Sequence, residues 1–306
     1  AVKFIITVYP TPFVNTQTDL TYCSNASANI VFNGSASSYL WNNSNTNTGI
    51  GSSGTDSIVF IAQNSFTSIL TSSIYVVPQF TIGNKFCFGD TMDFSIDINP
   101  LAIVTNALPD SICSDDPIIF NAVSNIPSAV ITWQRDSVAG IDNGAAFGTS
   151  GFIYETLISN SNVPVTVYYH FTLMADSCNS TFTDSIIIKP RPQLNSLSDS
   201  VYCNGELMPQ VNFNSNIPAT VFNWNCSNNI GIAALNGTGS VPSAYASNSG
   251  SDTIFAIFTV IPEAFGCQGN SKSFKVTVKD SPPEPQLFAL LNNGNSVCGI
   301  ASNISF

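Results

Sequence analysis

Residues 94–100 read FSIDINP, in which apolar and polar side chains alternate until a proline ends the run. Alternation of this kind indicates a half-buried β-strand, and proline cannot donate to the next rung of a ladder. The ending recurs every 90 residues, in FIITVYP at 4–10, DSIIIKP at 184–190 and, with aspartate as the last residue, FKVTVKD at 274–280. The sequence therefore predicts a structural repeat with this period.

Cysteine keeps the same register. What we term the first-position cysteines are Cys23, Cys113 and Cys203, spaced 90 residues apart. The second-position cysteines follow them after 64, 65 and 64 residues, and are Cys87, Cys178 and Cys267. One tryptophan lies 18 to 21 residues after each first-position cysteine: Trp41, Trp133 and Trp224.

These markers predict three repeats, at 11–100, 101–190 and 191–280. Residues 1–10 then form the last strand of a preceding repeat, and residues 281–306 begin a further one. Cys298 falls at the first position of that further repeat, and we expect its partner to lie beyond residue 306. We therefore interpret the chain as part of a longer array.

Each repeat consists of short alternating runs separated by turn residues, with no apolar stripe at helical spacing. The fold class we predict is all-β: a tandem array of immunoglobulin-like sandwiches, each with one disulfide. We place Cys203 before its strand and Cys267 in the loop before the last strand, so that the bond joins two loops at one end of a sandwich. Closing a loop of about 65 residues stabilises a domain by about 4 kcal/mol in the chain-entropy account.

Composition and charge exclude several functions. Charged residues make up 9% of the chain and the net charge is −11, which disfavours nucleic acid and anionic membranes as partners. No apolar run approaches the roughly 18–20 residues that span a bilayer, and we identify no targeting segment. The single histidine, His170, has no counterpart in the other repeats, and the cysteine spacing does not suit zinc. We predict that the chain is not an enzyme and holds no cofactor.

Two smaller features have alternative interpretations. Cys226 lies two residues after Trp224, on the same side of a strand, where we expect a buried small apolar residue; a reactive thiol is the alternative. Asp110, Asp115 and Asp116 are expected in a solvated turn, and a calcium site is the alternative.

The third repeat contains YCNGELMPQVNFNS at 202–215, FNWNC at 222–226, GTGSVPSA at 237–244 and GCQG at 266–269. These motifs resemble the PKD-like repeat of very large surface proteins of Bacteroidota, such as gliding-motility adhesins of the SprB type. The resemblance implies an extracellular adhesin attached to the outer membrane, exported by type IX secretion. It implies outer-membrane secretion and motility proteins as partners, in addition to neighbouring repeats and an external surface or polysaccharide.

Asp followed by Ser or Thr and an aliphatic residue or methionine occurs seven times in the chain. The triplet resembles the acceptor for O-glycosylation in Bacteroidota, although a turn that leads into a strand gives the same pattern. The candidate residues are Ser57, Thr91, Ser111, Ser137, Ser185, Ser200 and Thr253. We favour Ser111 and Ser200, which precede first-position cysteines.

We predict a non-enzymatic repeat region that forms a semi-rigid adhesive filament. The alternative is a carbohydrate-binding or spacer module of a secreted multidomain protein. That alternative requires an exposed aromatic platform, whereas we assign Trp41, Trp133 and Trp224 to the cores.

Overall fold

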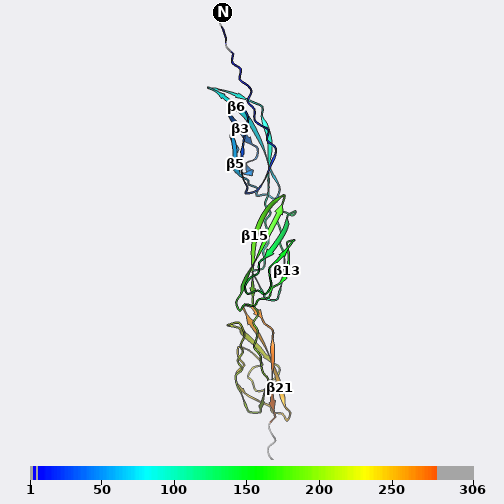
Figure 1. The fold of residues 1–306 in the computed structure, drawn as a ribbon. Helices are drawn as coiled ribbons and strands as arrows, with labels where there is room; N and C mark the ends of the chain where they lie inside the picture. Colours follow the sequence, from blue (N-terminus) through cyan, green and yellow to red (C-terminus); the bar gives the residue numbers. More distant parts are fainter. Residues whose placement is uncertain (1–2, 5, 281–306) are drawn as a thin grey trace, which may run out of the picture. The chain divides into compact units, whose positions relative to one another are not determined.

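In a computed structural model, which describes residues 3–4 and 6–280, the chain forms two compact units, Ala1–Arg191 and Pro192–Phe306. The first unit contains two β-sandwiches and the second contains one (Figure 1). The only helical element among the described residues is a single 3-10 turn, Thr46–Thr48. The all-β, immunoglobulin-like fold predicted from the sequence is confirmed.

Sandwich 1 packs a sheet in the order β1-β8-β6-β3-β4, with β7 paired to β6, against the two-stranded sheet β2-β5. Its strands are β1 Leu20–Cys23, β2 Ser27–Val31, β3 Ser38–Asn43, β4 Ser53–Thr55, β5 Ser57–Ile61, β6 Leu70–Ile82, β7 Lys85–Phe88 and β8 Met92–Asn99. The short β1 pairs in parallel with β8, which is the alternating run that revealed the repeat.

Sandwich 2 repeats this arrangement, with the larger sheet in the order β12-β11-β14-β15-β9 and the smaller sheet β10-β13. Its strands are β9 Ser111–Cys113, β10 Pro117–Asn121, β11 Val130–Arg135, β12 Ala146–Gly148, β13 Phe152–Thr156, β14 Val165–Ala175 and β15 Cys178–Lys189. The short β9 is again parallel to the last strand.

Sandwich 3 has the larger sheet β16-β23-β21-β18-β19, with β22 paired to β21, and the smaller sheet β17-β20. Its strands are β16 Ser200–Cys203, β17 Leu207–Met208, β18 Val221–Cys226, β19 Asn236–Thr238, β20 Ala244–Tyr245, β21 Ile254–Ala264, β22 Cys267–Gln268 and β23 Lys272–Lys279. Each sandwich has its own hydrophobic core, since three separate clusters of buried side chains lie within the described residues.

The three tryptophans lie in these cores, as predicted. Trp41, Trp133 and Trp224 retain 7, 7 and 5% of their exposure, and each contacts a glycine on the neighbouring strand. The register pairs Trp41 with Gly54, Trp133 with Gly148 and Trp224 with Gly237. A Cβ atom at any of these glycines would lie 2.3–2.6 Å from the indole, so only glycine lets the ring lie flat on the strand.

Two details of the expected strand pattern are wrong. Cys203 ends the short strand β16 instead of preceding a strand, and Cys267 begins β22 instead of lying in a loop. Residues 211–215 make only isolated bridges, through Val211 and Ser215. The short parallel strand escapes a search for alternation because three or four residues are too few to show a period.

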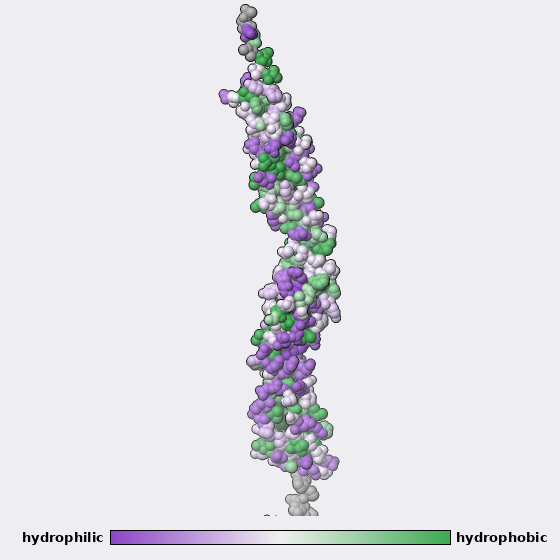
Figure 2. Space-filling model, viewed as in Figure 1, coloured by the Kyte–Doolittle hydropathy of each residue, from purple (hydrophilic) through white to green (hydrophobic). Residues whose placement is uncertain are grey.

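The outer faces of the two-stranded sheets expose apolar side chains, which are Val31, Val59 and Ile61 in sandwich 1, Ile119, Phe152 and Tyr154 in sandwich 2, and Leu207 and Tyr245 in sandwich 3. Figure 2 shows hydrophobic residues beside hydrophilic ones on the visible surface. With few charges in the chain, serine, threonine and asparagine supply much of the polar surface.

Candidate functional site: a covalent joint between sandwiches

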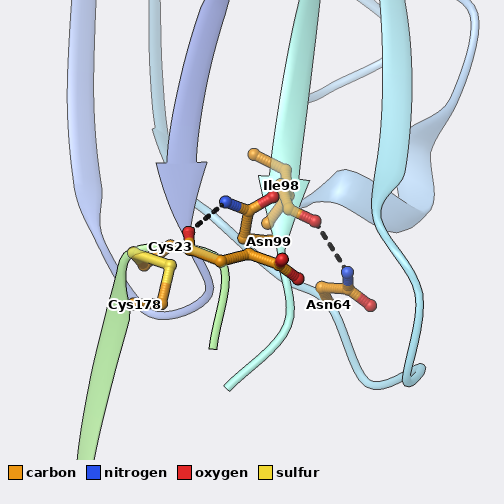
Figure 3. The surroundings of a disulfide bond; sticks show 6 residues. Cys23, Asn64, Ile98, Asn99 and Cys178 are labelled. Atoms are coloured by element: carbon orange, nitrogen blue, oxygen red, sulfur yellow. Dashed lines mark hydrogen bonds between the residues drawn. A yellow bond between two sulfur atoms is a disulfide. The ribbon is translucent and has the colours of Figure 1, made fainter. Parts of the chain in front are cut away.

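A disulfide joins Cys23 of sandwich 1 to Cys178 of sandwich 2 (Figure 3). The two Cα atoms are 5.6 Å apart, within the usual range for such a bond, and the sequence separation is 155 residues. The covalent bond therefore lies between consecutive sandwiches.

Cys23 is placed by the parallel pairing of β1 with β8, which sets it opposite Asn99 at the end of the last strand. Cys178 is placed by the hairpin of β14 and β15, where it pairs with Ala175 across a two-residue turn. Both turn residues, Asp176 and Ser177, have positive φ angles of 47° and 66°, as a tight turn that follows the strand twist requires. The hairpin tip of sandwich 2 thereby meets the end of sandwich 1.

One hydrogen bond crosses the joint, and a second fixes its donor residue, Asn99, within sandwich 1. Asn99 Nδ2 donates to the carbonyl oxygen of Asp176 at 2.8 Å, across the joint and beside the disulfide (Figure 3). The backbone N–H of Ser24 donates to Asn99 O at 2.9 Å. Asn99 is 7% exposed, so these bonds are shielded from water and are worth more than surface contacts.

A second asparagine fixes the loop behind the joint. Asn64 Nδ2 donates to Ile98 O at 2.7 Å (Figure 3). The same group donates to Ser68 O at 2.8 Å, and the backbone N–H of Asn64 donates to Ser24 Oγ at 3.0 Å. Sandwich 3 has the same set, because Asn248 donates to Val278 O and to Asp252 O. The asparagine that fixes this loop is therefore repeated at the same end of sandwiches 1 and 3.

The expected bond within each repeat is wrong. Cys23 and Cys178 bond each other instead of Cys87 and Cys113, and Cys203 is free among the described residues instead of bonded to Cys267. Cys23 lies opposite Asn99, whereas Cys87 lies opposite Phe80, beyond the other end of β8. β8 has eight residues, which at about 3.3 Å each separates its two ends by about 23 Å. A disulfide requires Cα atoms within about 7 Å, so the two cysteines of one sandwich cannot meet.

The other cysteines differ in state. Cys113 and Cys267 are disulfide-bonded, which confirms their expected oxidation. Cys87 and Cys203 are free among the described residues, and Cys298 lies outside them. Cys226 is free and 7% exposed, and burial raises the pKa of its thiol, so the expectation of a small buried residue is confirmed.

A buried ion pair in sandwich 2 was not predicted from the sequence. Arg135, 2% exposed, donates from Nε and from its NH2 group to the two carboxylate oxygens of Glu155, at 3.1 and 3.0 Å. Tyr169 Oη donates to Glu155 at 2.6 Å. Burial disfavours the charged form of Arg135, but the carboxylate of Glu155 outweighs this effect and raises the pKa of Arg135. Burial, and after it the Glu155 carboxylate, raise the pKa of Tyr169. These groups are satisfied within the core and are not open to a substrate.

The structure brings no catalytic or metal-binding set together from the residues that the sequence singled out. His170 lies on β14 with Nδ1 3.0 Å from Thr183 Oγ1. Asp116 forms an ion pair with Arg191 at 2.6 Å, at the turn that holds Asp115. Residues 3–4 and 6–280 contain no group of three or more His, Cys, Asp or Glu side chains that could hold a metal ion. In the same part of the chain no helix has the length and hydropathy to cross a membrane.

The candidate glycosylation residues differ in exposure. Ser111 and Ser200, which the sequence favoured, begin strands β9 and β16 and are half-buried, as are Ser57 and Ser185. Thr91, Ser137 and Thr253 are exposed. Accessibility therefore favours the last three as acceptors, and modification itself stays a prediction.

No family model matches the sequence, and no curated protein matches it. Among solved structures, the chain is similar to the I-band fragment I67–I69 of titin, with 10% identity and a TM-score of 0.43 over 90% of this chain and 100% of that one. Drosophila N-cadherin EC1-4 has 12% identity and a TM-score of 0.31, over 89% and 76% of the two chains. Sidekick-1 immunoglobulin domains 1–5 have 11% identity and a TM-score of 0.30, over 89% and 60%.

Proposed function

We propose that this chain is the repeat region of a long extracellular surface adhesin, in which linked sandwiches form a semi-rigid filament. The observation that carries the proposal is the Cys23–Cys178 disulfide between consecutive sandwiches. Disulfides persist in oxidising, extracytoplasmic compartments, which supports an extracellular location. A bond across a joint also limits hinge motion, which suits a filament more than a set of freely jointed modules.

The mechanical role has a direct test. With the disulfide closed, the 155-residue span from Cys23 to Cys178 cannot be extended by pulling on the chain ends. Reduction should release at least about 500 Å of contour length, since an extended residue spans about 3.3 Å. Single-molecule force spectroscopy of residues 1–306, with and without reductant, measures this length. An unchanged contour length would contradict a joint that resists tension.

Attachment to the outer membrane, type IX secretion and gliding motility belong to the proposal through the resemblance of the third repeat to Bacteroidota adhesins. Imaging live source cells with a fluorescent Fab against residues 191–280 tests this part. Spots that travel along the cell surface are expected for a motility adhesin. Static label would remove gliding from the proposal, and label only after lysis would overturn the surface location.

O-glycosylation is a further part of the proposal. Thr91, Ser137 and Thr253 are exposed and follow the Asp of the triplet, so an enzyme could reach them in the folded chain. Peptide mapping of protein from its native source is expected to show a glycan on at least one of the seven residues. Seven unmodified peptides would end this part.

A carbohydrate-binding module is the second candidate. Phe152 and Tyr154 are exposed on β13, beside Ile119 of β10, and form an aromatic surface of the kind that stacks on sugar rings. A glycan array with the wild-type chain and with Tyr154→Ser separates the candidates. Glycan binding that is lost in Tyr154→Ser would favour a carbohydrate-binding module. No glycan binding by the wild-type chain would favour the filament proposal.

A further inference from the structure

Two free cysteines occupy positions that are oxidised elsewhere in the chain. Cys87 is a second-position cysteine, like Cys178, and Cys203 is a first-position cysteine, like Cys23. Free thiols at these positions are unexpected if the disulfide belongs to a single sandwich, but not if it belongs to the joint between two. Their surroundings show whether they are built for the same joint.

Cys203 has the surroundings of Cys23. It pairs in parallel with Lys279 at the end of β23, as Cys23 pairs with Asn99 at the end of β8. The N–H three residues later donates to its carbonyl oxygen at 3.0 Å in both sandwiches. Behind it, Asn248 makes the hydrogen bonds that Asn64 makes behind Cys23. Cys203 is exposed, so its sulfur is accessible for a bond.

Cys87 shares part of the setting of Cys267, a second-position cysteine that is disulfide-bonded. Two residues after it, Gly89 lies so close to the carbonyl of Pro12 that a Cβ would stand 1.8 Å from the oxygen. Gly269, two residues after Cys267, stands in the same relation to Pro192. The hairpin that carries Cys87 is longer than those of Cys178 and Cys267, because its pairing continues past Cys87 to Ile82 and Lys85 before the turn. The second-position cysteine is thus held beside the segment through which the chain enters its sandwich.

The described residues near the N-terminus indicate which sandwich supplies the bonding partner of Cys87. Phe4, Ile6 and Val8 are 85, 84 and 85% exposed, and the residues ninety positions later are Phe94, Ile96 and Ile98, which are 5, 0 and 0% exposed. Those three are the core side chains of the last strand of sandwich 1. Phe4, Ile6 and Val8 therefore have the spacing of the core side chains of a last strand, and no sheet among the described residues covers them.

We infer that Cys87 and Cys203 are each one half of a disulfide between sandwiches. Cys87 bonds the first-position cysteine of a sandwich whose last strand contains Phe4, Ile6 and Val8. Cys203 bonds the second-position cysteine of a sandwich that follows residue 280. In each case two thiols lose two protons and two electrons to form the S–S bond, by exchange with a protein disulfide that is reduced to a dithiol. The inference does not depend on what the filament binds.

The test is a disulfide map of the full-length native chain. The chain is alkylated without reduction, digested, and analysed by mass spectrometry. We expect the Cys87 peptide to be linked to a peptide from the N-terminal side of residue 3, and the Cys203 peptide to one from the C-terminal side of residue 280. Alkylated Cys87 and Cys203, a Cys87–Cys23 bond, or a bond between two copies of the chain would overturn the inference.

Two variants sharpen the map. Cys87→Ser should cause loss of the first linked peptide and alkylation of its former partner, with the Cys23–Cys178 bond unchanged. Cys226→Ala, which removes a buried thiol outside the joints, is the matched control and should leave every linked peptide in place. Loss of the Cys87 linkage in the Cys226→Ala variant would contradict a specific joint.

Discussion

Sandwiches 1 and 2 have the same strand order and the same tryptophan–glycine contact, but they differ at two equivalent positions. The second-position cysteine is free in sandwich 1 and bonded in sandwich 2. Two residues after the tryptophan, sandwich 1 has Asn43, which donates to two backbone carbonyls, and sandwich 2 has Arg135 in a buried ion pair. The shared contacts build a sandwich, whereas the disulfide belongs to the joint, so its state depends on the neighbour.

The largest expected effect comes from the difference between the cores. Arg135→Ala leaves Glu155 and Tyr169 without a buried cation, which should lower the free energy of unfolding of sandwich 2 by about 3–5 kcal/mol. The double replacement Arg135→Met with Glu155→Leu should cost much less, because it removes both charges. Hydrogen exchange of β14 and β15 amides measures both. Equal loss in the single and double variants would contradict a paired role.

Asn43→Ala is the matched change in sandwich 1. The side-chain amide of Asn43 is neutral, and the change removes its two hydrogen bonds to backbone carbonyls. The free energy of unfolding of sandwich 1 should therefore fall by about 1–3 kcal/mol. A cost equal to that of Arg135→Ala would show that charge is not what distinguishes the two cores.

The next effect concerns the joint. Cys23→Ser removes the bond to Cys178, and the expected loss of stability is about 2–5 kcal/mol. Cys87→Ser in residues 1–306 should change stability by less than about 0.5 kcal/mol, since the thiol has no partner among the described residues. Urea unfolding of the two variants, followed by tryptophan fluorescence, makes the comparison. A loss of stability in Cys87→Ser similar to that in Cys23→Ser would show that Cys87 also forms a disulfide within residues 1–306.

A smaller effect is expected at the contact that the sandwiches share. Gly148→Ala places a Cβ 2.3 Å from Trp133 Nε1, and the overpacking should cost about 1–3 kcal/mol. Gly144→Ala is the control, because no heavy atom lies within 4 Å of the added carbon. Thermal unfolding of both variants should show a lower Tm only for Gly148→Ala. A lowered Tm in the control would indicate a backbone effect instead of a packing effect.

The smallest effect is a dependence on pH. A hydrogen bond from the backbone N–H of Ser95 lowers the pKa of Asp19 below its ordinary value of 3.8. Because the folded pKa is the lower one, the stabilisation is present above pH 3.8 and is lost as the pH falls through the folded value. Asp19→Asn should remove this dependence, so the Tm values of the two proteins should converge as the pH falls below 3.8. A constant difference in Tm would contradict the assignment.

The sequence predicts the period, the sandwich class and the buried tryptophans, because these depend on alternation and register. The glycine opposite each tryptophan was also within reach, since it follows the tryptophan by 13, 15 and 13 residues. The partner of each cysteine was not, because spacing does not say that Cys23 and Cys87 lie at opposite ends of β8. The Arg135–Glu155 pair occurs in one sandwich only, so a search for repeated features cannot find it.

The disulfide at Cys23 joins consecutive sandwiches. A peptide map of residues 1–306, alkylated and digested without reduction, detects this pairing. The structure predicts a linked peptide pair that contains Cys23 and Cys178. A pair that contains Cys23 and Cys87, or Cys113 and Cys178, would show that each sandwich closes its own bond, and the covalent joint would have to be abandoned.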